Sequence, residues 1–320
     1  MIKRRLGNSS LEVAPLVFGG NIFGWTADEP MSFKLLDAFV AAGLNMIDTA
    51  DVYSKWVPGH LGGESETIIG NWLSKRGGRD KVLIATKLGM EIAPGEQGLS
   101  KAYILRAVER SLKRLQTDYI DLYQSHRDDA ATPLQETLET FAELIRAGKV
   151  RAIGASNYKA DRLAEALRIS AAQGLPRYES LQPCYNLYDR ADYEAELGGL
   201  CQRENVGVIP YFALASGFLT GKYRSEKDLE GKARGQRVKT MLNERGFRIL
   251  KALDTLSAEL GASPAQISLA WLMARGVTAP IASATTLDQF NDLLGGTALE
   301  LGSDAVKLLN DASAAAIAAN

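Results

Sequence analysis

One short stretch of this sequence, Asn45 to Tyr53, combines residue types that could carry out chemistry. An apolar run ends at Ile47 and is followed by Asp48 and, five residues later, by Tyr53. Such a run has the character of a buried strand, and polar residues just past a strand end lie where barrels and open sheets bind ligands. Asp48 and Tyr53 are therefore candidates for a functional site, although Asp48 could equally cap the next turn while Tyr53 packs at the rim.

Two further polar residues, Lys87 and His126, also follow apolar runs. If these runs are parallel strands of one barrel, their carboxyl ends meet on one face, where Asp48, Tyr53, Lys87 and His126 would converge. Each has an ordinary alternative, a solvated cation for Lys87 and a satisfied rim residue for His126. Packing alone does not readily explain all four in one place.

These positions depend on strands and helices that alternate along the chain. From residue 16 onward, short apolar runs alternate with segments of helical spacing, which is typical of repeated strand-helix units around a parallel sheet. The runs predicted to be strands are residues 16–18, 44–47, 82–86, 120–123, 150–154, 180–182, 206–210 and 278–281.

The segments between these runs carry signals for helix ends. One ends before Gly43 and another begins at Ser100. Between the last two strands we expect a loop and two helices, the second introduced by Ser263 as N-cap and Pro264 in its first turn. A final helix is predicted over residues 304–318.

Eight strands, each followed by a helix, is the number that closes a (β/α)8 TIM barrel, and we expect one such domain over residues 1–320. Segments 2–6 and 11–15, separated by the turn-rich residues 7–10, predict an N-terminal β-hairpin. A doubly wound open sheet would show the same alternation. However, residues 19–24 lack the glycine spacing of the dinucleotide fingerprint, so a barrel is favoured.

Composition narrows the function class. The chain has 320 residues, 46% of them hydrophobic, and its 37 basic and 38 acidic residues give a net charge of −1. No overall field would hold it on nucleic acid or a membrane surface, so we expect a small-molecule ligand. Two cysteines, Cys184 and Cys201, make no disulfide framework, and no run approaches a membrane span, so we predict a cytoplasmic location. His60 and His126 lack ligand spacing, and no metal site is expected.

The polar residues and their surroundings resemble the aldo-keto reductase family, and the resemblance covers nearly the whole chain. Three separated motifs carry it, residues 47–53 (IDTADVY), 85–87 (ATK) and 121–126 (DLYQSH). The N-terminal hairpin is similar to the one that closes the bottom of the family's barrel. Further similarity lies in residues 154–157, in Gln182, and in Tyr211 followed by residues 214–223.

The resemblance implies NAD(P)H-dependent reduction of aldehyde or ketone carbonyls to alcohols by hydride transfer. Hydride addition leaves negative charge growing on oxygen, which requires a proton donor and hydrogen bonds to that oxygen. Tyr53 is the candidate general acid, and an ammonium group at Lys87 would lower the phenol's pKa from its ordinary value of about 10. Asp48 would pair with Lys87 and hold it in place, and His126 would orient the substrate carbonyl.

The resemblance also implies a nicotinamide dinucleotide that extends across the barrel mouth. Ser156, Asn157 and Gln182 match positions that bind the carboxamide, and Tyr211 matches the aromatic residue that stacks on the nicotinamide ring. Helix capping or rim packing would also explain these residue types. The predicted cofactor-binding residues are Gly20, Asn21, Asp48, Ser156, Asn157, Gln182, Tyr211, Leu214, Ser216, Lys222, Ser283, Thr285 and Gln289.

Two loop regions are expected to contact the cofactor pyrophosphate and the substrate. Residues 222–239 carry seven basic and three acidic side chains, which suggests a flap over the pyrophosphate, with Lys222 as its main cation. A solvated loop would have a similar composition. The predicted substrate-binding residues are Trp25, Tyr53, Trp56 and His126, although loop tryptophans often only pack.

Residues after the eighth predicted strand bear on which dinucleotide is used. Thr286 and Gln289 have the spacing of a capping box, so a helix should begin here and attract phosphate at its N-terminus. Many family members have an arginine at the position of Thr285 and an asparagine near Leu293, and this chain has neither. Ser283 and Thr285 could still bind the 2′-phosphate, so we predict a modest preference for NADP, with NAD usable.

Two other functions remain open on the sequence. The first is a nucleotide-binding regulatory or sensor subunit that resembles potassium-channel β subunits; its hallmark would be an added N-terminal arm, and only a few residues precede the predicted hairpin. The second is a barrel hydrolase or aldolase that uses Lys87 as a Schiff-base nucleophile, which leaves Tyr53 and Gln182 without a role. The sequence makes no prediction of oligomeric state.

Overall fold

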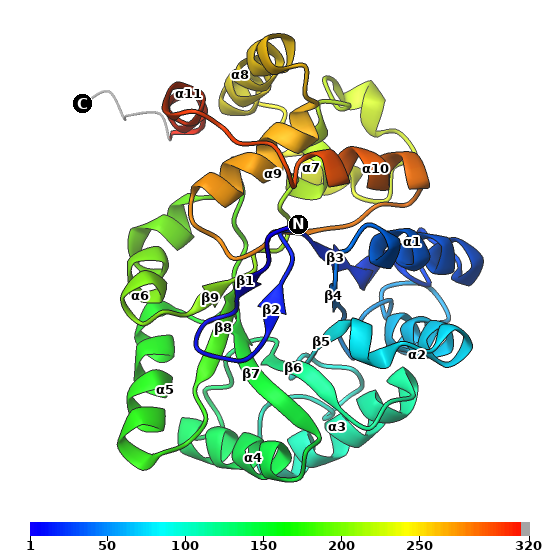
Figure 1. The fold of residues 1–320 in the computed structure, drawn as a ribbon, viewed down its shortest axis with the longest axis vertical. Helices are drawn as coiled ribbons and strands as arrows, with labels where there is room; N and C mark the ends of the chain where they lie inside the picture. The colour runs from blue at the N-terminus through cyan, green and yellow to red at the C-terminus, as the bar shows by residue number, and fades with distance from the viewer. Residues whose placement is uncertain (315–320) are drawn as a thin grey trace.

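A sheet of eight parallel strands forms the centre of the computed structural model, which describes residues 1–314 (Figure 1). The order of the strands is β10-β3-β4-β5-β6-β7-β8-β9. They are β3 (Val17–Gly19), β4 (Met46–Asp48), β5 (Leu83–Leu88), β6 (Ile120–Ser125), β7 (Val150–Ser156), β8 (Tyr178–Gln182), β9 (Gly207–Val208) and β10 (Ile281–Ala282).

Backbone hydrogen bonds join the two ends of this order. The Thr278 N–H donates to the Val208 carbonyl over 2.8 Å, and the Ile281 N–H donates to the Pro210 carbonyl over 2.9 Å. The sheet therefore curls round on itself, and the predicted (β/α)8 barrel is confirmed.

The predicted N-terminal hairpin is also present. Its strands β1 (Arg4–Arg5) and β2 (Glu12–Val13) pair antiparallel, and Figure 1 shows them across the centre of the ring. Leu6, Leu11 and Val13 are buried in the same apolar cluster as inward-facing residues of the barrel strands. The hairpin therefore closes the bottom of the barrel with hydrophobic side chains.

Side-chain alternation along the strands divides the interior into an apolar and a polar level. Met46 and Ala85 belong to the apolar cluster above the hairpin. Residues two positions further along a strand point into the same interior, nearer its carboxyl end. This rule brings polar side chains to the upper level from five strands, namely Asp48, Lys87, Gln124, Ser156 and Gln182.

Helices surround the barrel as the sequence predicts. Ser100 caps α3 by accepting from the Tyr103 N–H, and Ser263 caps α9 in a full capping box with Gln266. The last helix begins at Ser303, and residues 315–318 of its predicted span lie outside the described residues. The helices are α1 (Glu29–Ala41), α2 (Glu64–Arg76), α3 (Lys101–Leu115), α4 (Leu134–Arg146), α5 (Ala160–Gln173), α6 (Gly198–Arg203), α7 (Gly235–Lys239), α8 (Glu244–Leu260), α9 (Pro264–Ala274), α10 (Leu287–Gly295) and α11 (Ser303–Ser313).

The last two strands are shorter than or displaced from their predicted spans. Within the predicted strand 206–210, only Gly207–Val208 (β9) is a strand. In place of the predicted strand 278–281, the structure has β10 at Ile281–Ala282. Pro210 and Pro280 explain the difference, because proline has no N–H to donate to a sheet. The remaining boundaries shift by a few residues. No helix within residues 1–314 is long and apolar enough to cross a membrane.

Candidate active site

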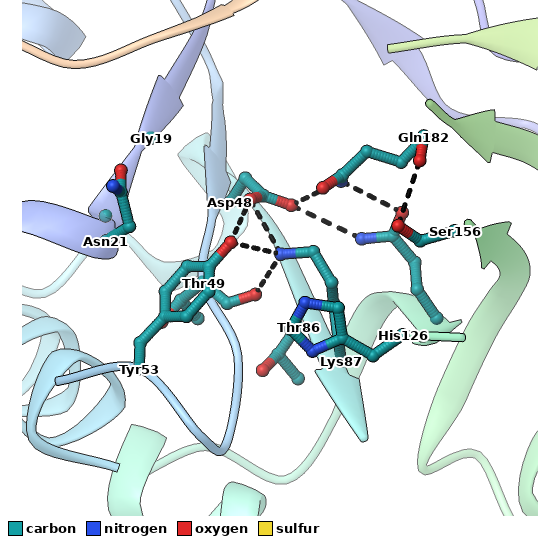
Figure 2. Close-up of polar contacts among 12 residues, drawn as sticks. Gly19, Asn21, Asp48, Thr49, Tyr53, Thr86, Lys87, His126, Ser156 and Gln182 are labelled. Carbon is teal, nitrogen blue, oxygen red and sulfur yellow. Dashed lines mark hydrogen bonds and ion pairs between the residues drawn. The ribbon is translucent and has the colours of Figure 1, made fainter. Parts of the chain in front are cut away.

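A fully buried lysine lies at the centre of the polar level. Lys87 Nζ donates to Asp48 Oδ2 over 2.8 Å, to the Thr49 carbonyl over 2.7 Å and to Tyr53 Oη over 2.9 Å (Figure 2). Its side chain is 0% exposed. These three acceptors use all the N–H groups of the ammonium. Burial lowers the pKa of Lys87, but Asp48 and Tyr53 outweigh it and the net direction is upward. Lys87 is therefore a buried cation with every donor satisfied.

Asp48 receives donors on both oxygens. Besides Lys87 on Oδ2, Gln182 Nε2 donates to Oδ1 over 2.8 Å and Gln124 Nε2 over 3.3 Å. Gln124 was missed in the sequence, although it faces inward two residues after Leu122 and pairs with Lys87 in the sheet register. Alternation along the strand would have found it. The carboxylate is held by an amide pair on one side and an ammonium on the other.

Tyr53 places its hydroxyl between this buried pair and the open mouth. Its ring is partly exposed, and Oη lies 2.9 Å from Lys87 Nζ and 3.5 Å from Asp48 Oδ2. Burial raises the pKa of Tyr53, Lys87 lowers it and Asp48 raises it, and the net direction is upward. The expected effect of Lys87 is thus present, but the expected net lowering is wrong, because burial outweighs the cation.

His126 lies beside Tyr53, with ring centroids 6.0 Å apart, and it is 8% exposed. Burial, followed by the charges of Lys87 and Arg127, holds the pKa of His126 well below its usual value. Its Nδ1 atom has no hydrogen-bond partner among the described residues. The imidazole is therefore neutral at neutral pH and can offer a hydrogen bond without adding charge.

These groups border a cavity of about 1190 Å³ at the carboxyl ends of the strands. That volume exceeds what a drug-sized ligand fills. Three predicted site residues are not on its wall: Lys87 and Gly20 lie beneath it, and Trp25 lines an adjoining chamber. The predicted site residues on its wall are Asn21, Asp48, Tyr53, Trp56, His126, Ser156, Asn157, Gln182, Tyr211, Leu214, Ser216, Lys222, Ser283, Thr285 and Gln289.

The amide and hydroxyl groups on one wall form a connected network. Ser156 Oγ donates to the Gln182 carbonyl over 2.9 Å, and Asn157 Nδ2 donates to the His126 carbonyl over 3.0 Å. Tyr211 Oη donates to Asn157 Oδ1 over 2.8 Å. Asn157 has a φ of 56°, a left-handed conformation that asparagine tolerates better than most residues. The network offers a donor and acceptor surface suited to a carboxamide.

A left-handed turn also lines the cavity. Ala215, Ser216 and Gly217 have φ angles of 47°, 59° and 95°. Such conformations are costly for non-glycine residues and cluster at ligand sites. Ser216 Oγ is buried without a partner in the described part of the chain, and an added Cβ at Gly217 would lie 3.4 Å from Lys222 Nζ. An unpaired hydroxyl beside a cation fits a phosphate-bearing ligand.

The helix predicted after the eighth strand begins where expected. Thr286 caps α10 by accepting from the Gln289 N–H over 3.2 Å. The Gln289 side chain does not complete a capping box, because its Oε1 accepts from Thr285 N–H and Oγ1 instead. Ser283 Oγ donates to the Gly19 carbonyl and contacts Asn21 Oδ1. Within residues 1–314, no three His, Cys, Asp or Glu side chains gather as metal ligands would.

The sequence is similar to known proteins over nearly its whole length. The model of the Aldo/keto reductase family matches residues 15–314. Protein tas of Escherichia coli is 35% identical, over 94% of this chain and 94% of its own. The uncharacterized oxidoreductase YrpG of Bacillus subtilis is 35% identical over 96% of this chain and 94% of its own. Aldo-keto reductase dtxS3 of Metarhizium robertsii is 34% identical over 96% of this chain and 89% of its own.

Proposed function

This chain belongs to the aldo/keto reductase family, whose members are NAD(P)H-dependent oxidoreductases of carbonyls, and we propose that it reduces small aldehydes or ketones with Tyr53 as general acid. The observation that carries the proposal is the placement of Tyr53 Oη, 2.9 Å from a buried ammonium and open to the cavity. A phenol in that position can give its proton to an oxygen in the cavity and leave its charge beside Lys87.

The buried pair prepares Tyr53 for this transfer. When the phenol loses its proton, Lys87 Nζ already donates toward the oxygen that becomes negative, so little rearrangement is needed. Asp48 keeps the ammonium charged and fixes its direction through a 2.8 Å contact. Both residues therefore act through Tyr53. Lys87 stabilises its phenolate, and Asp48 positions Lys87.

His126 is assigned to the substrate carbonyl. Its neutral ring stands beside the Tyr53 ring at the same opening, so the two can approach one oxygen from different directions. A neutral donor suits this role, because a second cation next to Lys87 would be unfavourable. Tyr53, His126, Trp56 and, from the adjoining chamber, Trp25 are the proposed substrate-binding residues.

The nicotinamide dinucleotide supplies the hydride when it is bound. Ser156, Asn157 and Gln182 would hold the carboxamide and thereby choose which ring face meets the carbonyl. Tyr211 would stack on the nicotinamide ring. Gly20, Asn21, Leu214, Ser216 and Lys222 would hold the pyrophosphate region, supported by the unpaired Ser216 hydroxyl and the cation beside the left-handed turn.

NADP is the proposed preferred cofactor, by a modest margin over NAD. The N-terminus of α10 borders the cavity and attracts phosphate, and Thr285 and Gln289 line it. The Ser283 and Thr285 hydroxyls are engaged with Gly19 and Gln289, so they would have to exchange partners to bind a 2′-phosphate. No arginine stands at this position, which keeps the preference small.

The test is a steady-state assay of the purified protein with NADPH and a panel of aliphatic and aromatic aldehydes and ketones, alongside a fluorescence titration with NADPH. Oxidation of NADPH that depends on the carbonyl compound supports the reductase. Tight NADPH binding without oxidation by any member of the panel would instead point to the regulatory or sensor subunit, and borohydride trapping of substrate on Lys87 would point to Schiff-base chemistry.

A further inference from the structure

Ser54, directly after the proposed acid, has an unusual backbone conformation. Its φ angle is 73°, in the left-handed region that is costly for residues other than glycine. Its side chain is 0% exposed, so it cannot touch a ligand itself. Two other residues with positive φ, Gln116 and Asn205, follow α3 and α6, where helices commonly end in this conformation. Ser54 follows no helix, so its conformation needs another explanation.

The Ser54 hydroxyl ties this turn to a neighbouring loop. Its Oγ atom donates to the Phe23 carbonyl over 2.7 Å, in the segment that follows β3. Phe23 is itself fixed, because its buried ring stacks on the Phe18 ring with centroids 5.4 Å apart. The Phe23 N–H also donates to the Gly20 carbonyl over 3.0 Å. The hydrogen bond therefore joins the chain after β4 to a firmly held point after β3.

Backbone hydrogen bonds hold the chain on either side of the turn. The Val57 N–H donates to the Ser54 carbonyl over 3.0 Å, and the Gly63 N–H donates to the Tyr53 carbonyl over 3.2 Å. The Tyr53 N–H donates to the Ala50 carbonyl over 3.2 Å. Little loose chain is present to absorb a change at Ser54, so such a change is passed on to Tyr53.

The phenol of Tyr53 depends on this backbone for its position. Figure 2 shows its hydroxyl directed at Lys87 Nζ, which is 2.9 Å away, while Asp48 Oδ2 lies at 3.5 Å. One close hydrogen bond thus holds the hydroxyl, and the ring is partly exposed at the mouth. The direction in which the backbone points the side chain therefore decides how far Oη lies from Lys87.

The hydroxyl and the strained backbone act in opposite directions. A buried hydrogen bond and a left-handed serine contribute free energies of similar size, so the bond can offset the strain. Without the hydroxyl, the backbone at Ser54 would relax toward the ordinary region, and the Phe23 carbonyl would lose a donor. Since Tyr53 and Ser54 share a peptide unit, this relaxation would turn the phenol away from Lys87.

We propose that Ser54 is a positioning residue for the proposed acid: its hydroxyl locks the left-handed turn onto Phe23 and thereby keeps Tyr53 Oη in contact with Lys87. The proposal rests on the proposed role of Tyr53 in carbonyl reduction and adds a residue that contacts neither substrate nor cofactor.

Two substitutions separate the hydroxyl from the backbone conformation. Ser54→Ala removes the hydroxyl and keeps a Cβ that disfavours the left-handed region, whereas Ser54→Gly removes the hydroxyl but adopts that region freely. We expect kcat with NADPH to fall by roughly tenfold to a hundredfold in Ser54→Ala, as for a catalytic group displaced by up to about 1 Å. Ser54→Gly should lose less. KM for the carbonyl compound and NADPH affinity should change less than about twofold, because Ser54 touches neither ligand.

Ser170→Ala is the matched control for the loss of a buried hydroxyl. Ser170 is also buried, and its Oγ atom donates to the Pro176 carbonyl over 3.0 Å, but it lies on α5, away from the cavity wall. This variant should keep the wild-type kcat.

A double substitution shows whether Ser54 acts through Tyr53. Adding Ser54→Ala to Tyr53→Phe should lower kcat no further, because the hydroxyl that Ser54 positions is already gone, whereas a purely structural residue would lower kcat again. The pH profile gives a second readout. Burial raises the pKa of Tyr53 and Lys87 lowers it, so a looser contact with Lys87 should move the phenol limb of kcat/KM to higher pH in Ser54→Ala.

The results distinguish the two proposals. Full turnover in Tyr53→Phe would end the assignment of the acid. Loss of turnover in Tyr53→Phe, with kcat and the pH limb unchanged in both Ser54 variants, overturns the role of Ser54 alone.

A crystal structure of Ser54→Ala supplies a readout that needs no turnover. A distance from Tyr53 Oη to Lys87 Nζ clearly longer than 2.9 Å supports the proposal, and an unmoved phenol overturns it. If Ser54→Ala does not fold, Ser54→Gly keeps the turn accessible and carries the same measurements.

Discussion

Asp48 and Asp51 are both buried and only three residues apart, but they lie on opposite sides of the barrel wall. Asp48 points inward and is 1% exposed, with Lys87, Gln182 and Gln124 donating to its two oxygens. Asp51 is 2% exposed in the layer between the barrel and helices α2 and α3. The two carboxyl groups have nearly the same exposure and very different partners.

Burial and a neighbouring carboxylate, Glu66, dominate the surroundings of Asp51. Its Oδ1 atom has no partner among the described residues, and its closest charged neighbours are Glu66 and Arg114. Glu66 already accepts from Arg114 Nε over 2.7 Å and from Thr86 Oγ1 over 2.6 Å. Burial, reinforced by Glu66, raises the pKa of Asp51 to about 8, while Arg114, the Val52 N–H and Lys87 oppose the shift.

Partners, rather than burial, decide where this fold keeps charge. Inside the mouth, Lys87 and Asp48 form an ion pair in which each member satisfies the other, and four further groups complete the set, the Thr49 carbonyl, Tyr53, Gln182 and Gln124. Outside the wall, a carboxyl of equal burial keeps its proton near neutral pH. The chemistry-bearing side is therefore the one in which every charged donor and acceptor is matched.

The largest expected effect comes from removing the Tyr53 hydroxyl, the proposed proton donor. Tyr53→Phe should lower turnover by roughly 10² to 10⁴, the range for losing a general acid, because Tyr53 is the one residue within 1–314 whose hydroxyl contacts Lys87 Nζ. Steady-state kinetics with NADPH and the best carbonyl substrate measure it, with NADPH affinity as the control for an intact pocket. Turnover equal to the wild type would end the assignment of Tyr53.

The inner pair can be broken directly with Lys87→Met. Asp48 would lose its ammonium, and breaking a buried pair costs on the order of 3 to 5 kcal/mol, which denaturant unfolding measures. Since Lys87 lowers the pKa of Tyr53, its loss should also move the limb of the pH–kcat/KM profile that reports the phenol to higher pH. A profile that does not move in a folded variant would contradict the coupling of Lys87 to the acid.

The outer carboxyl can be tested by Asp51→Asn, which resembles the protonated acid. The folded protein keeps this proton up to about pH 8, whereas the ordinary pKa of an aspartate carboxyl is 3.8. Its contribution to stability is therefore present at low pH and is lost as the pH rises toward 8. Relative to the variant, the wild type should lose on the order of 1 to 2 kcal/mol of unfolding free energy between pH 6 and pH 8.

Urea unfolding at the two pH values measures this difference. Asp118→Asn, at an exposed position at the end of α3, is the matched control and should follow the wild type. If Asp51→Asn and the wild type show the same pH dependence, Asp51 is ionised in the folded protein and the contrast with Asp48 disappears.

The smallest expected effect concerns the 2′-phosphate. Replacing both Ser283 and Thr285 by alanine should weaken NADPH binding by roughly threefold to tenfold and leave NADH binding nearly unchanged, because each neutral hydrogen bond contributes little. Fluorescence titration with both dinucleotides measures the change. Tighter binding of NADH by the wild type, or a preference that survives the double replacement, would show that this segment does not select the phosphate.

Local sequence signals predicted the barrel and its central residues, because the strand ends are marked by abrupt changes from apolar to polar. Asp48, Lys87 and His126 each follow such a change. Gln124 was overlooked because it stands between the end of the apolar run at Tyr123 and the more conspicuous His126. Alternation along the strand nevertheless points its side chain inward. The net pKa direction of Tyr53 depends on burial, and the chamber that Trp25 lines is built from four stretches of the chain, around residues 21–25, 56, 212–216 and 233–237. Neither is contained in a local pattern.

The two prolines at the closure of the barrel have a consequence for its motions. Pro210 has no amide donor to offer across the seam between β9 and β10, where its carbonyl accepts from the Ile281 N–H, and the Val208 N–H bonds to the Thr278 side chain rather than to a neighbouring carbonyl. The missing donor of Pro280 is on its other side, where its carbonyl accepts from the Val17 N–H of β3. A seam with fewer ladder bonds should open more easily than the other strand pairs, and we expect its amide hydrogens to exchange with solvent faster. Tyr211 and Ser283 lie directly beyond this seam, so brief opening there would loosen the wall that is proposed to bind the dinucleotide, while the strands around Lys87 stay paired.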